Sequence, residues 1–87
     1  MKLKYDFAVR EIAGDFVLVP LGAAALQLSG MITTNAVGAF LCEQLMAEIT
    51  EGELVQRLMK EFEVDAATAA NDVKEFLDRL HKLDLIQ

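Results

Sequence analysis

The 87-residue sequence is poor in the residues that most often carry chemistry, with one cysteine, one histidine and no tryptophan. A single cysteine, Cys42, excludes an internal disulfide framework. One cysteine and one histidine also provide too few ligands for a structural zinc site. We therefore predict that the protein uses no metal and no cofactor.

Basic residues are also scarce, since 8 Lys and Arg stand against 14 Asp and Glu, for a formal net charge of −6. Non-specific binding to nucleic acid depends on Lys and Arg that displace counterions from the phosphates. Anionic membrane surfaces likewise attract basic segments. The charge balance therefore argues against both nucleic acid and membrane as partners.

A long hydrophobic run is missing as well. The longest apolar stretch, residues 16–26, is interrupted by Pro20 and Gly22 and is too short to span a bilayer. Residues 1–6 are polar and mixed in charge, so we expect no signal peptide. These features predict a cytoplasmic protein, and the length predicts a single domain over residues 1–87.

The first third of the chain favours strands. Residues 7–12 (FAVREI) and 16–19 (FVLV) are rich in the β-branched and aromatic residues that sheets prefer. Gly14-Asp15 between them is a hairpin signal, because glycine can adopt the positive φ of a tight turn. The continuous apolar run 16–19 predicts the central strand of a small sheet, which Pro20 ends because it has no N–H to donate.

A third strand is predicted over residues 30–33, after a turn signal at Ser29-Gly30. Residues 26–28 alternate in hydrophobicity too. The pattern leaves open whether residues 26–28 and 31–33 form one bulged strand or two short ones.

The rest of the chain favours helices. Asn35 is a good N-cap for a helix over residues 36–48, and its apolar residues on most sides indicate burial. Gly38 costs this helix about 1 kcal/mol relative to alanine. Its presence therefore predicts the close approach of a neighbouring element.

Two amphipathic helices complete the chain. Thr50 and Glu53 form a capping box for a helix that ends near Phe62, and Asp65 caps a last helix over residues 66–83. Charged side chains flank both sides of the apolar stripe of this last helix. Lys74 and His81 lie on one flank, and Asp72 and Arg79 lie on the other.

No catalytic constellation is present in the sequence. Cys42 lies in the middle of an apolar helix with no base spaced to reach it, so we interpret it as a buried structural cysteine. His81 has no carboxylate or serine partner at a useful spacing, and we interpret it as a partly exposed helical residue. No glycine-rich phosphate loop precedes a helix. We predict that the protein is not an enzyme.

Two binding functions fit the sequence only in part. A phosphopantetheine carrier would use Ser29, but no acidic residue precedes it and the β-rich first third does not suit an all-helical carrier. A winged-helix DNA reader fits the tight junction between the last two helices, yet a recognition helix should present basic or amide side chains to base edges. The outer face of the last helix instead carries charges that nearly cancel: Asn71, Asp72, Glu75, Asp78, Arg79 and Lys82.

The order of turns, caps and apolar positions resembles the PqqD-like family, the peptide chaperones and precursor-recognition domains of ribosomally made, modified peptides. Residues 10–20 (REIAGDFVLVP) resemble the opening hairpin of the family. Residues 30–41 (GMITTNAVGAFL) resemble its junction between strand and helix. Residues 50–54 (TEGEL) and 72–80 (DVKEFLDRL) resemble its last two helices. The founding members act in pyrroloquinoline quinone biosynthesis.

The resemblance implies an α+β, winged-helix-like fold in which a three-stranded antiparallel sheet is followed by three helices. It also implies a non-catalytic adaptor that captures the leader segment of a precursor peptide and presents it to a modifying enzyme, often a radical-SAM maturase. The leader would add as a strand to the third strand and lie against the third helix. An exposed edge suits this role because its N–H and C=O groups are unpaired.

The residues expected to contact the leader are Gly30, Met31, Ile32, Thr33, Val73, Lys74, Leu77, Leu80 and His81. Apolar leader side chains would enter beside Val73, Leu77 and Leu80, and Lys74 or His81 would pair with an acidic leader residue. Ordinary core packing is an equally good interpretation of the apolar helix residues.

Two further alternatives stay open. The edge at residues 31–33 could be covered by the termini of the protein or by a second copy, so we expect a monomer or a weak or domain-exchanged dimer. The alternative function is that of a winged-helix-like regulatory or scaffolding module, which would hold another protein at the same edge.

Overall fold

The computed structural model describes residues 1–23, 25 and 30–87. Three strands come first along the chain, β1 (Phe7–Ile12), β2 (Asp15–Pro20) and β3 (Ile32–Thr34). They are followed by α2 (Ala36–Gln44), α3 (Glu51–Phe62) and α4 (Ala66–Lys82). The strands form one antiparallel sheet in the order β1-β2-β3. The expected α+β fold, with three antiparallel strands before three helices, is confirmed.

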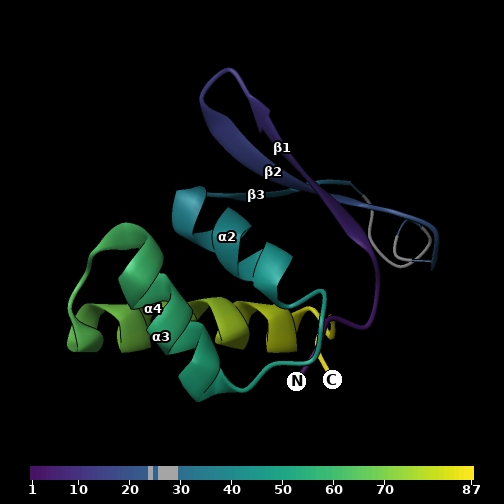
Figure 1. Cartoon of the computed structure of the whole chain (residues 1–87). Helices are drawn as coiled ribbons and strands as arrows, with labels where there is room; N and C mark the ends of the chain where they lie inside the picture. The colour runs from purple at the N-terminus through teal and green to yellow at the C-terminus, as the bar shows by residue number, and fades with distance from the viewer. Residues whose placement is uncertain (24, 26–29) are drawn as a thin grey trace.

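The helices cover one face of the sheet. In Figure 1, α2 lies between the sheet and the pair formed by α3 and α4. Phe7, Leu18 and Ile32, one from each strand, are buried in the core that the sheet shares with the helices. The central position predicted for β2 is confirmed, although the strand is longer than predicted and includes both Asp15 and Pro20.

The turn between β1 and β2 lies one residue earlier than predicted. Ile12 pairs with Asp15, so the loop consists of Ala13 and Gly14 and not of Gly14 and Asp15. Both loop residues have a positive φ, 53° at Ala13 and 87° at Gly14. A type I′ hairpin turn requires a positive φ at two successive residues. Ala13 therefore adopts the left-handed conformation although it is not a glycine.

Ala13→Asn is expected to raise the free energy of unfolding by about 0.5–1 kcal/mol. Asparagine tolerates the left-handed region better than alanine, and Asn-Gly is the preferred pair for this turn. Urea unfolding followed by circular dichroism measures the change. Ala67→Asn is the matched control, because this exposed residue of α4 has no positive φ and there asparagine should destabilise. An A13N protein no more stable than the parent would contradict the turn assignment.

The helix caps lie where the sequence predicts them. The Asn35 side chain accepts from the Gly38 N–H at 2.8 Å, and Thr50 and Glu53 form the reciprocal capping box. Asp65 Oδ1 accepts from the Thr68 N–H at 2.7 Å. This hydrogen bond lowers the pKa of the Asp65 carboxyl below its ordinary value.

Helix α2 is shorter than predicted and ends at Gln44 instead of residue 48. The carbonyl of Leu45 accepts from the Leu3 N–H at 2.9 Å, and the Ile49 N–H donates to the Met1 carbonyl at 3.0 Å. Leu45 and Ile49 are both buried in the core. Hydrogen bonds to the N-terminal segment therefore replace the last helical turn. The local sequence around residues 45–49 does not predict these hydrogen bonds.

The question of one bulged strand or two concerns residues 26–28, and these lie outside the described residues, as does Ser29. Strand β3 begins at Ile32 and not at Gly30 as predicted. Gly30 has a φ of 121°, which is outside the extended region that strands occupy. The strand therefore starts only after the glycine.

Candidate functional site

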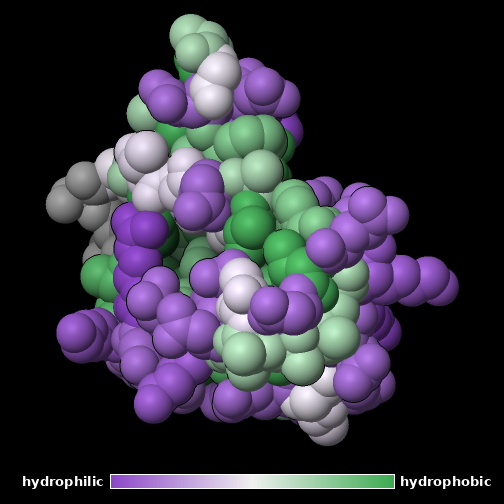
Figure 2. Space-filling model, turned by 90° about the vertical axis from the view of Figure 1, so that its left-hand side faces the viewer, coloured by the Kyte–Doolittle hydropathy of each residue, from purple (hydrophilic) through white to green (hydrophobic). Residues whose placement is uncertain are grey.

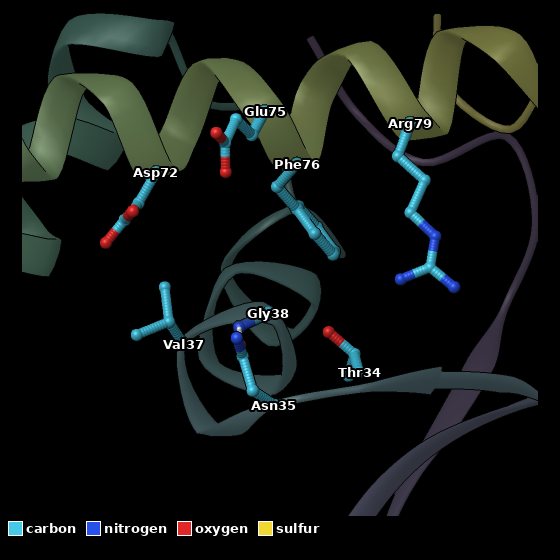
Figure 3. Close-up of a pocket in the computed structure, with 8 residues that line it drawn as sticks. All are labelled: Thr34, Asn35, Val37, Gly38, Asp72, Glu75, Phe76 and Arg79. Carbon is cyan, nitrogen blue, oxygen red and sulfur yellow. Dashed lines mark hydrogen bonds between the residues drawn. The ribbon is translucent and has the colours of Figure 1, made fainter.

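A groove of about 220 Å³ lies between the end of β3 and helix α4. It is drawn in Figure 3, and we call it the β3–α4 groove. The end of β3 and the first turn of α2 form one side, and α4 forms the other. Its lining residues are Thr34, Asn35, Val37, Gly38, Asp72, Glu75, Phe76 and Arg79.

The side formed by β3 and α2 depends on a close approach at Gly38. A Cβ atom at this position would overlap Thr34 Oγ1 and would lie 3.3 Å from Phe76 Cε1. Asn35 turns the chain from β3 into α2 by capping the helix on the Gly38 N–H. The predicted close approach is confirmed, and the neighbouring elements are β3 and α4.

The side formed by α4 carries charged residues at the surface and one apolar residue deeper in the groove. Asp72, Glu75 and Arg79 share one flank of the helix because they are spaced by three and four residues. Phe76 is 8% exposed and lies between the charged residues in Figure 3. The groove can therefore hold an apolar side chain and charged side chains of both signs.

The edge of β3 borders the groove. β3 pairs with β2 along one side, with Val17 opposite Thr33 and Leu18 opposite Ile32. No strand among residues 1–23, 25 and 30–87 pairs with its other side. Ile32 is buried against the core, whereas Thr33 and the preceding Met31 are exposed, Met31 to 60%. Gly30 is exposed as well.

The apolar residues predicted on α4 lie in the core. Val73, Leu77 and Leu80 are 0%, 4% and 2% exposed and belong to the cluster that joins the sheet and the helices. Their side chains do not line the groove. Their environment is that of ordinary core packing, and they hold α4 against the rest of the core.

The two charged residues of α4 that are predicted to contact the leader lie on the flank of the helix opposite to the groove. Lys74 and His81 are exposed and do not line the groove, which is bordered by Asp72 and Arg79. The sequence pattern identifies both flanks of the apolar stripe. The pattern does not indicate which of the two flanks faces β3, because that depends on where the sheet lies in the folded protein.

Cys42, the single cysteine of the chain, does not line the groove. Cys42 is buried in α2, and its burial raises the pKa of the thiol to about 12. The thiolate is the nucleophilic form of cysteine, so Cys42 is unreactive near neutral pH. The described residues contain no cluster of three or more metal-ligating side chains.

The molecular surface near the groove is partly hydrophobic. Figure 2 shows the face that carries the first turn of α2 and the junction of α3 and α4, and hydrophobic surface gathers in its middle between hydrophilic borders. Val37, at the start of α2, is half-buried and belongs to the lining of the groove. Within the described residues, no helix has the length and apolar character that crossing a membrane requires.

Comparisons with known proteins support a family assignment. A solved structure described as "TbiB1 in Complex with the TbiA(beta) Leader Peptide" matches with a TM-score of 0.70 and 24% sequence identity. The match covers 100% of this chain and 95% of that chain, and at this identity it shows the fold. No curated protein matches the chain.

The family described as "Coenzyme PQQ synthesis protein D (PqqD)" matches residues 15–86. The matched region extends from the first residue of β2 to beyond the end of α4. It therefore includes β3, α2 and α4, the three elements that line the β3–α4 groove. The resemblance that the sequence motifs suggest is confirmed, and the chain belongs to the PqqD family.

Proposed function

We propose that this protein is a non-catalytic adaptor that captures the leader segment of a ribosomal precursor peptide and presents it to a modifying enzyme. The leader adds as a strand beside β3 and lies in the β3–α4 groove. The observation that carries the proposal is the position of this groove, next to a strand edge that no described strand occupies. Membership in the PqqD family and the leader peptide held by TbiB1 support it.

Backbone pairing at β3 would provide the sequence-independent part of the affinity. Each hydrogen bond formed with the edge gives a net gain of about 0.5–1.5 kcal/mol. β3 has only 3 residues, so Met31, which precedes the strand, would extend the pairing. Gly30, with its φ of 121°, lies outside the extended conformation that pairing requires. Such a short edge gives modest affinity, and side chains that enter the groove must add to it.

Side chains of the bound strand would alternate between the groove and solvent. An apolar side chain that points into the groove meets Phe76 and Val37, and the two flanking positions meet Asp72, Glu75 or Arg79. Val73, Leu77 and Leu80 would act indirectly, by holding α4 at its distance from β3. The modifying enzyme that we propose as partner is a radical-SAM maturase.

Titration of ¹⁵N-labelled protein with synthetic leader peptides tests the proposal, using precursors encoded beside the gene. We expect amide shift changes at β3 and at the groove-lining residues of α4. Arg79→Ala should weaken binding severalfold, whereas Lys74→Ala removes the same charge from the opposite flank and should not. Shift changes confined to β1 and α3 would contradict the proposal, and an equal loss in both variants would contradict the choice of flank.

A further inference from the structure

The charges of the β3–α4 groove are separated by sign along its length. Asp72 and Glu75 come first along α4 and Arg79 comes last, with Phe76 between them (Figure 3). A helix rises 1.5 Å per residue, so Asp72 and Arg79 are separated by roughly 10 Å along the axis. In Figure 3 Asp72 lies on the side of Val37, and Arg79 lies on the side of Thr34.

These charges are available to a ligand. Glu75 and Arg79 are four residues apart in the order that favours a helical ion pair, yet the ion pairs formed among the described residues do not include them. The hydrogen bonds of the described side chains do not include Asp72 or Arg79 either, and Glu75 accepts only a long 3.4 Å bond from Asn71 Nδ2. Arg79 extends away from Glu75 towards Thr34 in Figure 3.

The relative directions of β3 and α4 determine which end of a bound strand lies near the acidic residues and which end lies near Arg79. β3 leads through Thr34 and Asn35 into α2, whereas α4 runs in the opposite direction across the groove (Figures 1 and 3). A strand added antiparallel to β3 therefore runs in the same direction as α4. Its N-terminal part passes Asp72 and Glu75, and its C-terminal part passes Arg79.

We propose that the groove selects a leader segment in which a basic residue precedes an acidic residue by four positions, with an apolar residue midway between them. This inference rests on the proposed function. Every second residue of a strand points to the same side, at intervals of about 7 Å, so the basic and acidic residues are about 14 Å apart along the strand. Their long side chains lean inward to reach Asp72 and Arg79, which are roughly 10 Å apart along α4. The basic residue then faces Asp72 and Glu75, the apolar residue faces Phe76, and the acidic residue faces Arg79.

The same arrangement selects the orientation of the strand. In a parallel orientation the acidic residue of such a leader would face Asp72 and the basic residue would face Arg79. Both attractions would become repulsions. Backbone pairing alone distinguishes the two orientations only weakly, so the charged flank of α4 sets the direction in which the precursor leaves the adaptor.

Two synthetic peptides of identical composition test the charge order, Ac-TKTVTET-NH₂ and Ac-TETVTKT-NH₂, with Ac-TQTVTQT-NH₂ as the neutral reference. Dissociation constants come from amide shifts of the labelled native protein at low salt. We expect the first peptide to bind about tenfold more tightly than the second, with the neutral peptide between them. The difference should shrink at 1 M salt, where charges are screened within about 3 Å.

A charge exchange in the protein provides the second arm. Asp72→Arg combined with Arg79→Asp keeps the net charge and should invert the peptide preference. The matched control, Lys74→Asp combined with Asp78→Lys, exchanges two exposed charges of α4 that do not line the groove and should leave the preference unchanged. Thermal unfolding reports whether each variant is folded, and the peptide pair tests the native protein in any case.

The outcomes separate this inference from the proposed function. If all three peptides shift the amides of β3 with equal affinity, strand addition stands and the charge order is overturned. An unchanged preference in the Asp72 and Arg79 exchange also overturns it. If none of the peptides shifts the amides of β3 or α4 at millimolar concentration, strand addition itself is overturned.

Discussion

Leu80→Ala is expected to lower the free energy of unfolding by about 2–5 kcal/mol. The Leu80 side chain is 2% exposed and packs in the core beneath α4. Its truncation removes buried methyl groups and leaves a cavity that the surrounding side chains fill only partly. A domain of this size has a total stability on the order of 5–10 kcal/mol, so the variant should lose a large share of it. Urea unfolding followed by circular dichroism measures the loss.

The control for this experiment is Leu83→Ala. Leu83 follows the last turn of α4 and is 40% exposed, so the same truncation should cost less than about 1 kcal/mol. Leu80 is one of the residues for which the family resemblance implies leader contact, with core packing as the equal alternative. A Leu80→Ala protein that keeps its stability but loses leader binding would show a contact role and contradict the core role.

Gly38→Ala is expected to destabilise the protein by about 1–3 kcal/mol, because an added Cβ overlaps the Thr34 hydroxyl and presses on the Phe76 ring. Alanine at an unhindered helix position would instead stabilise by about 1 kcal/mol. The expected sign is therefore opposite to that of helix propensity. Thr34 and Phe76 both line the β3–α4 groove, so the variant should also weaken leader binding. Chemical unfolding and peptide titration of the same sample measure the two effects.

Two further variants make this prediction specific. Combining Gly38→Ala with Thr34→Ala removes the overlapping hydroxyl and should recover most of the lost stability, as a double-mutant cycle would show. In Gly52→Ala, the matched control in α3, the nearest atom to the new Cβ is Thr50 Oγ1 at 4.0 Å. This variant should be as stable as the parent or slightly more stable. A Gly38→Ala protein that behaves like Gly52→Ala would contradict the close approach.

Features that depend on a few neighbouring residues were predictable from the sequence. The caps at Asn35, Thr50 and Asp65 each satisfy an N–H three residues further on, so the sequence pattern and the hydrogen bond coincide. The extent of β1, the central position of β2 and the burial of Cys42 follow from short apolar patterns in the same way. Gly38 was informative because its cost to the helix requires a compensating contact.

Features that depend on distant parts of the chain were not predictable. The hairpin turn lies at Ala13-Gly14 because strand pairing places Asp15 opposite Ile12. Helix α2 ends early because the N-terminal segment takes over the hydrogen bonds of Leu45 and Ile49. In each case a partner far along the chain changes the outcome of a local preference.

The sequence by itself determined the order of the elements, the charge of the chain and the two charged flanks of α4. Only the tertiary structure decided that the flank with Asp72 and Arg79 faces β3, whereas Lys74 and His81 face away. Helical periodicity shows which residues share a face, but it is nearly symmetrical about the apolar stripe. That symmetry is broken when α4 packs against α3 and α2, and the side on which β3 lies then becomes the side of the groove.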